Sequence, residues 1–282
     1  MFADRRHWSF SAINQYLRCP LQYYFERVLK LPQPTVSSGI VLGSAVHAAL
    51  ADYHLNLQRR TPTNIDKLQR IVLAYWTLRE AERPVQYKAG DNRVVLLATA
   101  IGLLETYLQQ PPPEGIVGVE QRLLVPLINS DGDYLETPLA AVIDLLTCEG
   151  RQLKVREFKT SGRAYGEMEV ETSLQATSYV NAVWHAYGEW AAVEYNILIK
   201  TKTPKFQRLT TARRESDVGR LGDIVENVER AVDQKIFLPI ESPLNCSTCT
   251  FRQPCLQWKP QRNLVPLLEP VRLNGHVSCS PN

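Results

Sequence analysis

Two segments, Val142-Ile143-Asp144-Leu145-Leu146 and Val155-Arg156-Glu157-Phe158-Lys159-Thr160-Ser161, decide how this chain folds and where its chemistry lies. Both read as β-strands, and the turn Glu149-Gly150-Arg151 stands between them. A hairpin of the two strands would bring Asp144 beside Glu157. Glu157 and Lys159 stand two positions apart, so their side chains project from the same face of the strand.

This juxtaposition suits a metal ion. Two neighbouring carboxylates repel each other, and a hard divalent cation such as Mg²⁺ or Mn²⁺ relieves that repulsion. Such an ion lowers the pKa of a bound water and polarises a phosphoryl oxygen. Lys159, on the same face, is placed to orient that water or to stabilise a pentavalent transition state. Spacing alone leaves open the alternative that Glu157 and Lys159 form an ordinary solvated strand face.

The order of the other elements sets the fold class. The first half of the chain reads as helices, and the run Pro111-Pro112-Pro113 ends the last of them. The second half changes to strand-like alternation. Helices are expected after a Ser9 or Ser11 cap, from Pro20, and over 43–57, 65–78, 94–108, 174–187 and 218–236. Strands are expected over 116–128, 139–146, 153–158, 191–199 and 207–211. This order predicts an α/β fold with a mixed sheet.

Composition excludes several classes of protein. The 282 residues are 44% hydrophobic and 22% charged, which fits a folded globular chain and no fibrous or disordered one. The formal net charge is only +3, so a nucleic-acid site would have to be local. The longest apolar run, 94–104, is well short of the ~20 residues of a membrane span. No signal peptide is evident, and we expect a cytoplasmic protein without membrane contact.

Four cysteines have the spacing of metal ligands. Cys246, Cys249 and Cys255 form a CxxC-x5-C cluster, and Cys19 is the upstream candidate for a fourth ligand. Spacing alone leaves zinc and an iron–sulfur cluster open, with a slight preference for zinc. Cys148 and Cys279 have no partner at ligand spacing.

In family order, four motifs resemble those of the PD-(D/E)XK nuclease superfamily, in particular its RecB-like branch. They are the strand ending at Asp144, the segment Glu157-Phe158-Lys159-Thr160, an upstream Gly43-x-x-x-His47 and a downstream Gln175-x-x-x-Tyr179. The resemblance runs from Ser9 to Cys255. It implies a restriction-endonuclease-like core, in which a mixed central sheet is flanked by helices. The implied organisation is an N-terminal helical part (1–57), a helical insert (58–113), the nuclease core (114–240), a cysteine clasp (241–262) and a disordered tail (263–282).

The resemblance also assigns roles. It implies that His47, Asp144, Glu157 and the carbonyl of Phe158 bind Mg²⁺ or Mn²⁺, that Lys159 is the catalytic lysine, and that Gln175 and Tyr179 support the site or contact DNA. From its place on the first strand, Glu120 is a candidate accessory acid facing the same cleft.

The cysteines gain a role from the same resemblance. The segment from Arg18 to Phe25 is similar to the first-cysteine segment of AddB nuclease domains and of CRISPR-associated adaptation nucleases. Those proteins use one upstream cysteine and a downstream CxxC-x5-C for a [4Fe–4S] cluster. The resemblance therefore implies such a cluster on Cys19, Cys246, Cys249 and Cys255, with a structural role.

A local basic stretch is the candidate DNA-binding segment. Basic residues recur from position 200 to position 214 without an acidic one between them, and we select Lys200, Lys202, Lys205 and Arg208. The stretch would edge the cleft and follow a nucleic-acid backbone. The alternative is a solubilising hairpin.

The function expected from these features is metal-dependent hydrolysis of phosphodiester bonds in DNA, on single strands or at ends, in recombination and repair. CRISPR spacer acquisition is an alternative process with the same chemistry. A non-catalytic DNA-binding subunit of a helicase–nuclease assembly and a zinc-stabilised interaction module are alternatives of other classes. The chain has no Gly-x-x-x-x-Gly-Lys-[Ser/Thr] loop, so ATP-driven unwinding would need a helicase partner.

Overall fold

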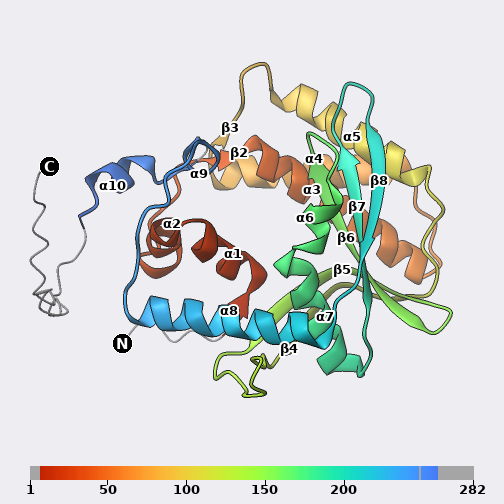
Figure 1. The fold of residues 1–282 in the computed structure, drawn as a ribbon. Coiled ribbons are helices and arrows are strands. Elements are labelled where there is room, and N and C mark those ends of the chain that lie inside the picture. Colours follow the sequence, from red (N-terminus) through yellow and green to blue (C-terminus); the bar gives the residue numbers. More distant parts are fainter. Residues whose placement is uncertain (1–6, 248, 260–282) are drawn as a thin grey trace, which may run out of the picture.

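A computed structural model describes residues 7–247 and 249–259. Its centre is a mixed sheet in which the strands pair in the order β1-β5-β6-β7-β8 (Figure 1). A sixth strand, β4, lies off this path and also pairs with β5. The strands are β1 (Trp8–Ser9), β4 (Ile116–Val125), β5 (Leu139–Glu149), β6 (Gln152–Ser161), β7 (Ala192–Ile199) and β8 (Lys205–Thr211). The pairs β1/β5 and β6/β7 are parallel, and the other pairs are antiparallel.

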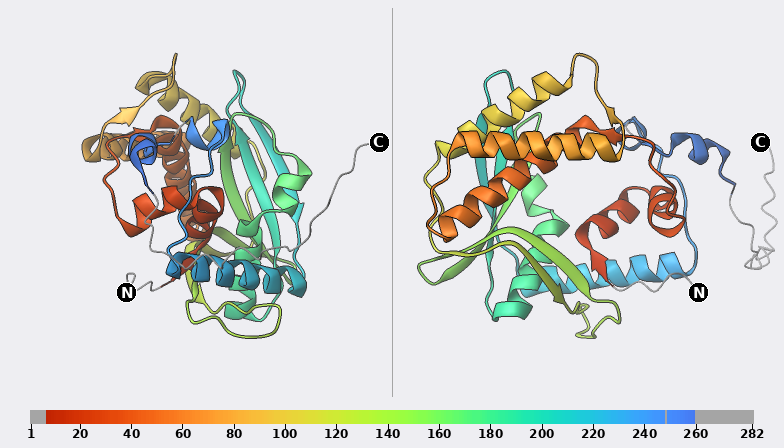
Figure 2. Two further views of the ribbon diagram at one scale, coloured as in Figure 1. Left: turned by 60° about the vertical axis from the view of Figure 1, so that its left-hand side comes forward. Right: turned by 180° about the vertical axis from the view of Figure 1, so that it is seen from behind.

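One helical layer covers each face of this sheet (Figure 2). The first layer contains α1 (Phe10–Arg18), α2 (Pro20–Tyr23), the π-helix η1 (Tyr24–Val28), α7 (Leu174–Tyr187) and α8 (Glu215–Asp233). The second contains α3 (Ser38–Gln58), α4 (Ile65–Glu82) and α5 (Arg93–Leu108). Alternate residues of the strands feed two separate cores, because successive side chains point to opposite faces.

Three further elements, β2, β3 and α6, are short. β2 (Val36–Ser37) and β3 (Val85–Gln86) form a small parallel sheet beside the second layer, and α6 (Glu167–Glu171) precedes α7. This α/β architecture with a mixed, helix-flanked sheet confirms the predicted fold class. All five predicted strands and the predicted helices form, with ends that differ by a few residues. The short elements were not predicted, since so few residues carry no periodicity.

The C-terminal segment packs against the first two helices. The Leu21 N–H donates to the Leu238 carbonyl, and the Tyr16 hydroxyl donates to the Ile236 carbonyl. The rings of Tyr24 and Phe237 stack with centroids 4.6 Å apart. These contacts bring α9 (Pro243–Cys246) and α10 (Arg252–Gln257) back to the N-terminal layer. The first helices and the segment around residues 236–238 are therefore joined by ordinary packing, independently of the cysteines.

The division into an N-terminal part, an insert, a core and a clasp stays a prediction. Its boundary at 57/58 falls at the end of α3, whose side chains share one core with α4 and α5. The proposed tail 263–282, the end of the clasp and Cys279 lie outside the described residues. No helix in the described part of the chain is long and apolar enough to cross a membrane.

Candidate metal centre

Asp144 lies where β5 and β6 separate. The paired residues run from Glu149 and Gln152 to Leu145 and Arg156, and β6 then continues along β7 alone. At this fork the backbone N–H of Phe158 donates to Oδ2 of Asp144 at 2.9 Å. The carboxylate thus replaces a strand partner, which fixes it beside the segment that carries Glu157 and Lys159.

His47 reaches the same point from α3. The helix comes close to β6 at Gly43, where an added Cβ atom would lie 3.2 Å from Oγ1 of Thr160. One turn later, Nδ1 of His47 lies 3.5 Å from Oδ2 of Asp144. A glycine before the histidine therefore has a packing reason, because a side chain there would require Thr160 or the helix to shift by a few tenths of an ångström.

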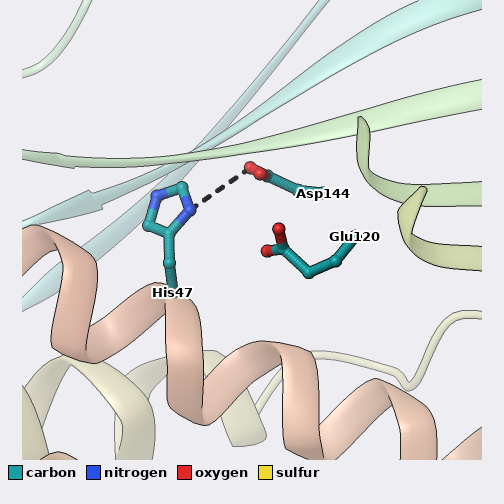
Figure 3. A group of neighbouring side chains, drawn as sticks. All are labelled: His47, Glu120 and Asp144. Carbon is teal, nitrogen blue, oxygen red and sulfur yellow. Dashed lines mark ion pairs between the residues drawn. The ribbon is translucent and has the colours of Figure 1, made fainter. Parts of the chain in front are cut away.

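Glu120 completes a group of three potential ligands (Figure 3). Its carboxylate, the imidazole of His47 and the carboxylate of Asp144 offer ligand atoms that all lie within 4.8 Å of one another. Glu120 has φ 48°, a left-handed backbone conformation that is unusual for a residue other than glycine. Among the described residues this is the one such group of three or more histidine, cysteine or acidic side chains.

The charges of this group depend on one another. Burial works against ionisation of Asp144, but the hydrogen bond and charge of His47 outweigh it, so the pKa of Asp144 lies below its usual value. Burial also works against a charged His47, and Asp144 in turn raises the pKa of this imidazole above its usual value. Burial, and then the charge of Asp144, raises the pKa of Glu120. A divalent cation would relieve the repulsion between the two acids.

Glu157 and Lys159 belong to a second, adjoining network that α7 completes. Oε1 of the buried Glu157 accepts hydrogen bonds from Nζ of Lys159 at 2.6 Å and from Nε2 of Gln175 at 2.9 Å. Its Oε2 accepts one from the Tyr179 hydroxyl at 2.7 Å. Lys159 also donates to Oε1 of Gln175 at 2.8 Å, and Nε2 of Gln175 donates to the Tyr179 hydroxyl at 2.7 Å. Gln175 and Tyr179 are one helical turn apart, so both face the same carboxylate.

The pKa of Glu157 shifts in the opposite direction from that of Asp144. Burial, followed by the charge of Asp144, raises the pKa of Glu157 above its usual value, against the opposing effects of Lys159 and Tyr179. Burial would lower the pKa of Lys159, but the Glu157 carboxylate outweighs it and raises that pKa. The two acids therefore ionise at different pH values, Asp144 before Glu157, as in sites where two carboxyl groups have different tasks.

The structure thus places the expected residues in two neighbouring groups. His47 and Asp144 lie together with Glu120, whereas the carboxylate of Glu157 is turned towards Lys159, Gln175 and Tyr179. A cavity of about 700 Å³ opens onto the first group and is bounded by α3, Tyr75 and Arg122. Sequence reasoning missed Arg122, although it stands two positions after Glu120 and the strand alternation places both on one face.

The basic hairpin lies elsewhere. None of Lys200, Lys202, Lys205 and Arg208 lines the cavity beside the metal group. Arg208 lies 3.4 Å from the buried Glu194 and its guanidinium stands over the ring of Phe206, so its charge is used within the fold. The assignment of these four residues to DNA binding stays a prediction.

A cluster of three rings, His54, Tyr107 and Phe158, was also not predicted from the sequence. The ring of His54 stacks on Phe158 at 5.2 Å, and its Nε2 lies 2.8 Å from the Tyr107 hydroxyl. Burial lowers the pKa of His54 to about 3, so this imidazole is neutral. This cluster packs around Phe158, the residue whose backbone N–H donates a hydrogen bond to Asp144. His54 stands seven residues after His47 on α3, a spacing that predicts a shared helix face.

The four predicted cluster cysteines surround a separate cavity of about 560 Å³. Cys19 lies between α1 and α2, and Cys246, Cys249 and Cys255 come from the C-terminal segment. All are free thiols, as is Cys148. Burial, and next the neighbouring thiol groups, raises the pKa of Cys255.

Taken together, a mixed, helix-flanked sheet and a group of two carboxylates and an imidazole at its fork define an α/β protein with a candidate divalent-metal centre. A family model described as the PD-(D/E)XK nuclease superfamily matches residues 7–256. The chain therefore belongs to the PD-(D/E)XK nuclease superfamily, which confirms the broad family predicted from the motifs and supports a nuclease that acts on DNA. The search of curated proteins found no match.

The fold has a counterpart among solved structures. The chain is similar to the crystal structure of a "putative exonuclease" from Eubacterium rectale, with a TM-score of 0.59 and 10% identity. The match covers 94% of this chain and 92% of that one. At this identity the likeness concerns the fold alone.

Proposed function

We propose that this chain is a metal-dependent deoxyribonuclease of the RecB-like branch, which hydrolyses phosphodiester bonds in single-stranded DNA or at DNA ends. The observation that carries the proposal is the group His47–Glu120–Asp144 at the mouth of a cavity, adjoining the network of Glu157 and Lys159. Within a nuclease superfamily, an acidic group suited to a metal beside a half-buried lysine has a direct use in phosphodiester hydrolysis.

The donor set fits a hard divalent ion. Carboxylate oxygens suit Mg²⁺ and Mn²⁺, and the imidazole is better tolerated by Mn²⁺. His47, Asp144 and Glu120 would hold the ion, and Glu157 with the Phe158 carbonyl would be further ligands from β6. When bound, the ion would polarise the phosphodiester and lower the pKa of a water molecule.

The remaining residues have separate tasks in this proposal. Lys159 orients the attacking water or stabilises the negative charge that develops on the phosphoryl group. Gln175 and Tyr179 hold Glu157 and Lys159 in place through the network described above. The Phe158 N–H fixes the carboxylate of Asp144. In this proposal each side chain has one role, and DNA enters through the cavity beside His47, Glu120 and Asp144.

We further propose that Cys19, Cys246, Cys249 and Cys255 hold a [4Fe–4S] cluster that fastens the C-terminal segment. A single tetrahedral zinc ion would bring its thiolates to about 3.8 Å from one another, given zinc–sulfur bonds of about 2.3 Å. No three of these cysteines, all of them described residues, lie within 4.8 Å of one another. The cavity of about 560 Å³ that the four cysteines line leaves room for a polynuclear group.

Recombination and repair is the process that fits this chemistry, with a helicase as the partner that would supply single strands in the cytoplasm. The proposal is tested by following end-labelled single-stranded DNA with protein purified without oxygen, in the presence of Mn²⁺ or Mg²⁺. We expect cleavage by the unmodified protein, loss in Lys159→Ala, and retention in Lys154→Ala, a lysine of the same strand that pairs with Glu149. A folded, iron-loaded protein that cleaves in no case would favour the non-catalytic subunit instead.

A further inference from the structure

The outward face of the β4–β5 ribbon continues directly from the metal group. Glu120 and Arg122 alternate with inward residues on β4, and Val142 and Asp144 do so on β5. Arg122 faces Val142 in the register, and the next outward pair along the ribbon is Leu124 and Ala140. The opposite face of this ribbon is buried in the first core. The outward side chains of this ribbon therefore form a strip that leads away from Glu120 and Asp144.

Arg122 is the charged residue of this strip. It lines the same cavity as His47, Glu120 and Asp144. It is exposed and forms no hydrogen bond or ion pair within the described part of the chain. A guanidinium presents several N–H donors in a fork that matches phosphate, and here this fork is available beside the metal group.

Exposed apolar side chains border Arg122. Leu124 is 65% exposed and Val142 is 41% exposed, on the two strands of the ribbon. Ile40 on α3 is 61% exposed and lines the metal cavity from the other wall, where Tyr75 also lies. Large apolar side chains that gather in the open next to an unpaired arginine indicate a contact surface.

We infer that this strip, Arg122, Leu124, Val142 and Ile40, is the track on which one unpaired strand of DNA enters the metal centre. A backbone phosphate binds Arg122, and bases pack against the apolar side chains. Bases in a duplex are stacked inside the double helix, so only an unpaired strand offers both a phosphate and base faces to such a strip. The inference rests on the proposed function and names the substrate and the residues that guide it.

The test is the binding of a dye-labelled thymidine oligonucleotide to the full chain, purified without oxygen, in EDTA, followed by fluorescence anisotropy at several salt concentrations. We expect Arg122→Ala to weaken binding about tenfold and to reduce the slope of log affinity against log salt by about 0.7, the loss of one phosphate contact on a single strand. Arg122→Lys should keep the slope. Leu124→Ser with Val142→Thr should weaken binding about tenfold at an unchanged slope.

The matched control is Arg220→Ala, since Arg220 is exposed on α8 and also lacks a partner within the described residues. It should bind like the unmodified chain, and thermal melting checks that every variant is folded. Unchanged affinity and slope in Arg122→Ala, no binding of single strands by the unmodified chain, or equal losses on duplex DNA would each overturn the track. The binding assay contains EDTA, so it does not depend on cleavage, and the two proposals can fail separately. If Arg122→Ala weakens binding but the unmodified chain never cleaves DNA with Mn²⁺, the nuclease is rejected and the track is kept. If Arg122→Ala changes neither binding nor Mn²⁺-dependent cleavage, the track is rejected and the nuclease is kept.

Discussion

Glu120 and Asp144 face each other across β4 and β5. The pairs on either side, Val119 with Leu145 and Gln121 with Ile143, fix this register. The ladder of paired residues skips the position between them, where Glu120 has φ 48°. The strand thus departs from regular geometry at the point where the carboxylate of Glu120 approaches His47 and Asp144.

A backbone held in this conformation costs ~1–3 kcal/mol in a residue other than glycine. We therefore expect Glu120→Gly to be more stable than Glu120→Gln by about 1 kcal/mol, since both remove the charge and only glycine relaxes the backbone. Urea unfolding in EDTA measures this difference.

Calorimetric titration with Mn²⁺ should show that both variants bind the ion more weakly than the unmodified chain. Equal stability of the two variants would mean that the conformation carries no cost, and unchanged Mn²⁺ affinity would remove Glu120 from the ligand set.

Tyr179→Phe removes one of the three donors to the buried Glu157. A hydrogen bond to a charged group contributes ~1.5–3 kcal/mol, so the free energy of unfolding should fall by about that amount. Since this bond lowers the pKa of Glu157, its loss raises that pKa, and the acidic limb of the pH–rate profile should move to higher pH. Tyr134→Phe, in an exposed loop, is the control. A profile that does not move would show that Glu157 is not the group that limits the rate in acid.

His54 should make the protein less stable in weak acid. Its pKa is about 3 in the folded chain, because of burial, against ~6.5 when unfolded. Between these values the unfolded chain binds a proton that the folded chain does not, so stability falls as the pH falls below 6.5, by at most about 1.4 kcal/mol per pH unit.

The measurement is urea unfolding from pH 7.5 to pH 5. His54→Gln should have a shallower dependence than the unmodified chain, while His7→Gln, at an exposed histidine, should not differ from it. Parallel curves for all three proteins would contradict a neutral, buried His54.

Cys255→Ser should abolish the brown colour and lower the iron and sulfide content, while Cys148→Ser, on β5, should keep both. Because residues 236–238 are bonded to the N-terminal helices independently of the cysteines, we expect local release rather than global unfolding. Limited proteolysis should then cut near residues 246–255 and leave the core intact. A colourless unmodified protein that contains zinc would reject the cluster in favour of the zinc alternative.

Much of the fold follows from local sequence. Apolar spacing predicted α7 at its observed bounds, and alternation predicted β5, β6 and β7 within a few residues. The spacing of Glu157 and Lys159 predicted a shared face, and their side chains do meet. Gln175 and Tyr179, which only the resemblance assigned to the site, stand one helical turn apart and both bond to Glu157. These features depend on neighbours in the chain, which periodicity records.

Other features depend on how distant segments meet. The place of Glu120 beside Asp144 follows from the register of β4 on β5, and the use of Arg208 by Glu194 follows from the pairing of β8 with β7. The hydrogen bonds of Glu157 with Gln175 and Tyr179 follow from the docking of α7. The spacing of side chains along one strand does not reveal which strand pairs with it or which helix packs on it. The sequence by itself therefore determined the elements and the motif residues, whereas only tertiary packing decided that Glu120 lies with His47 and Asp144, and that Arg122 lies beside them on the same cavity.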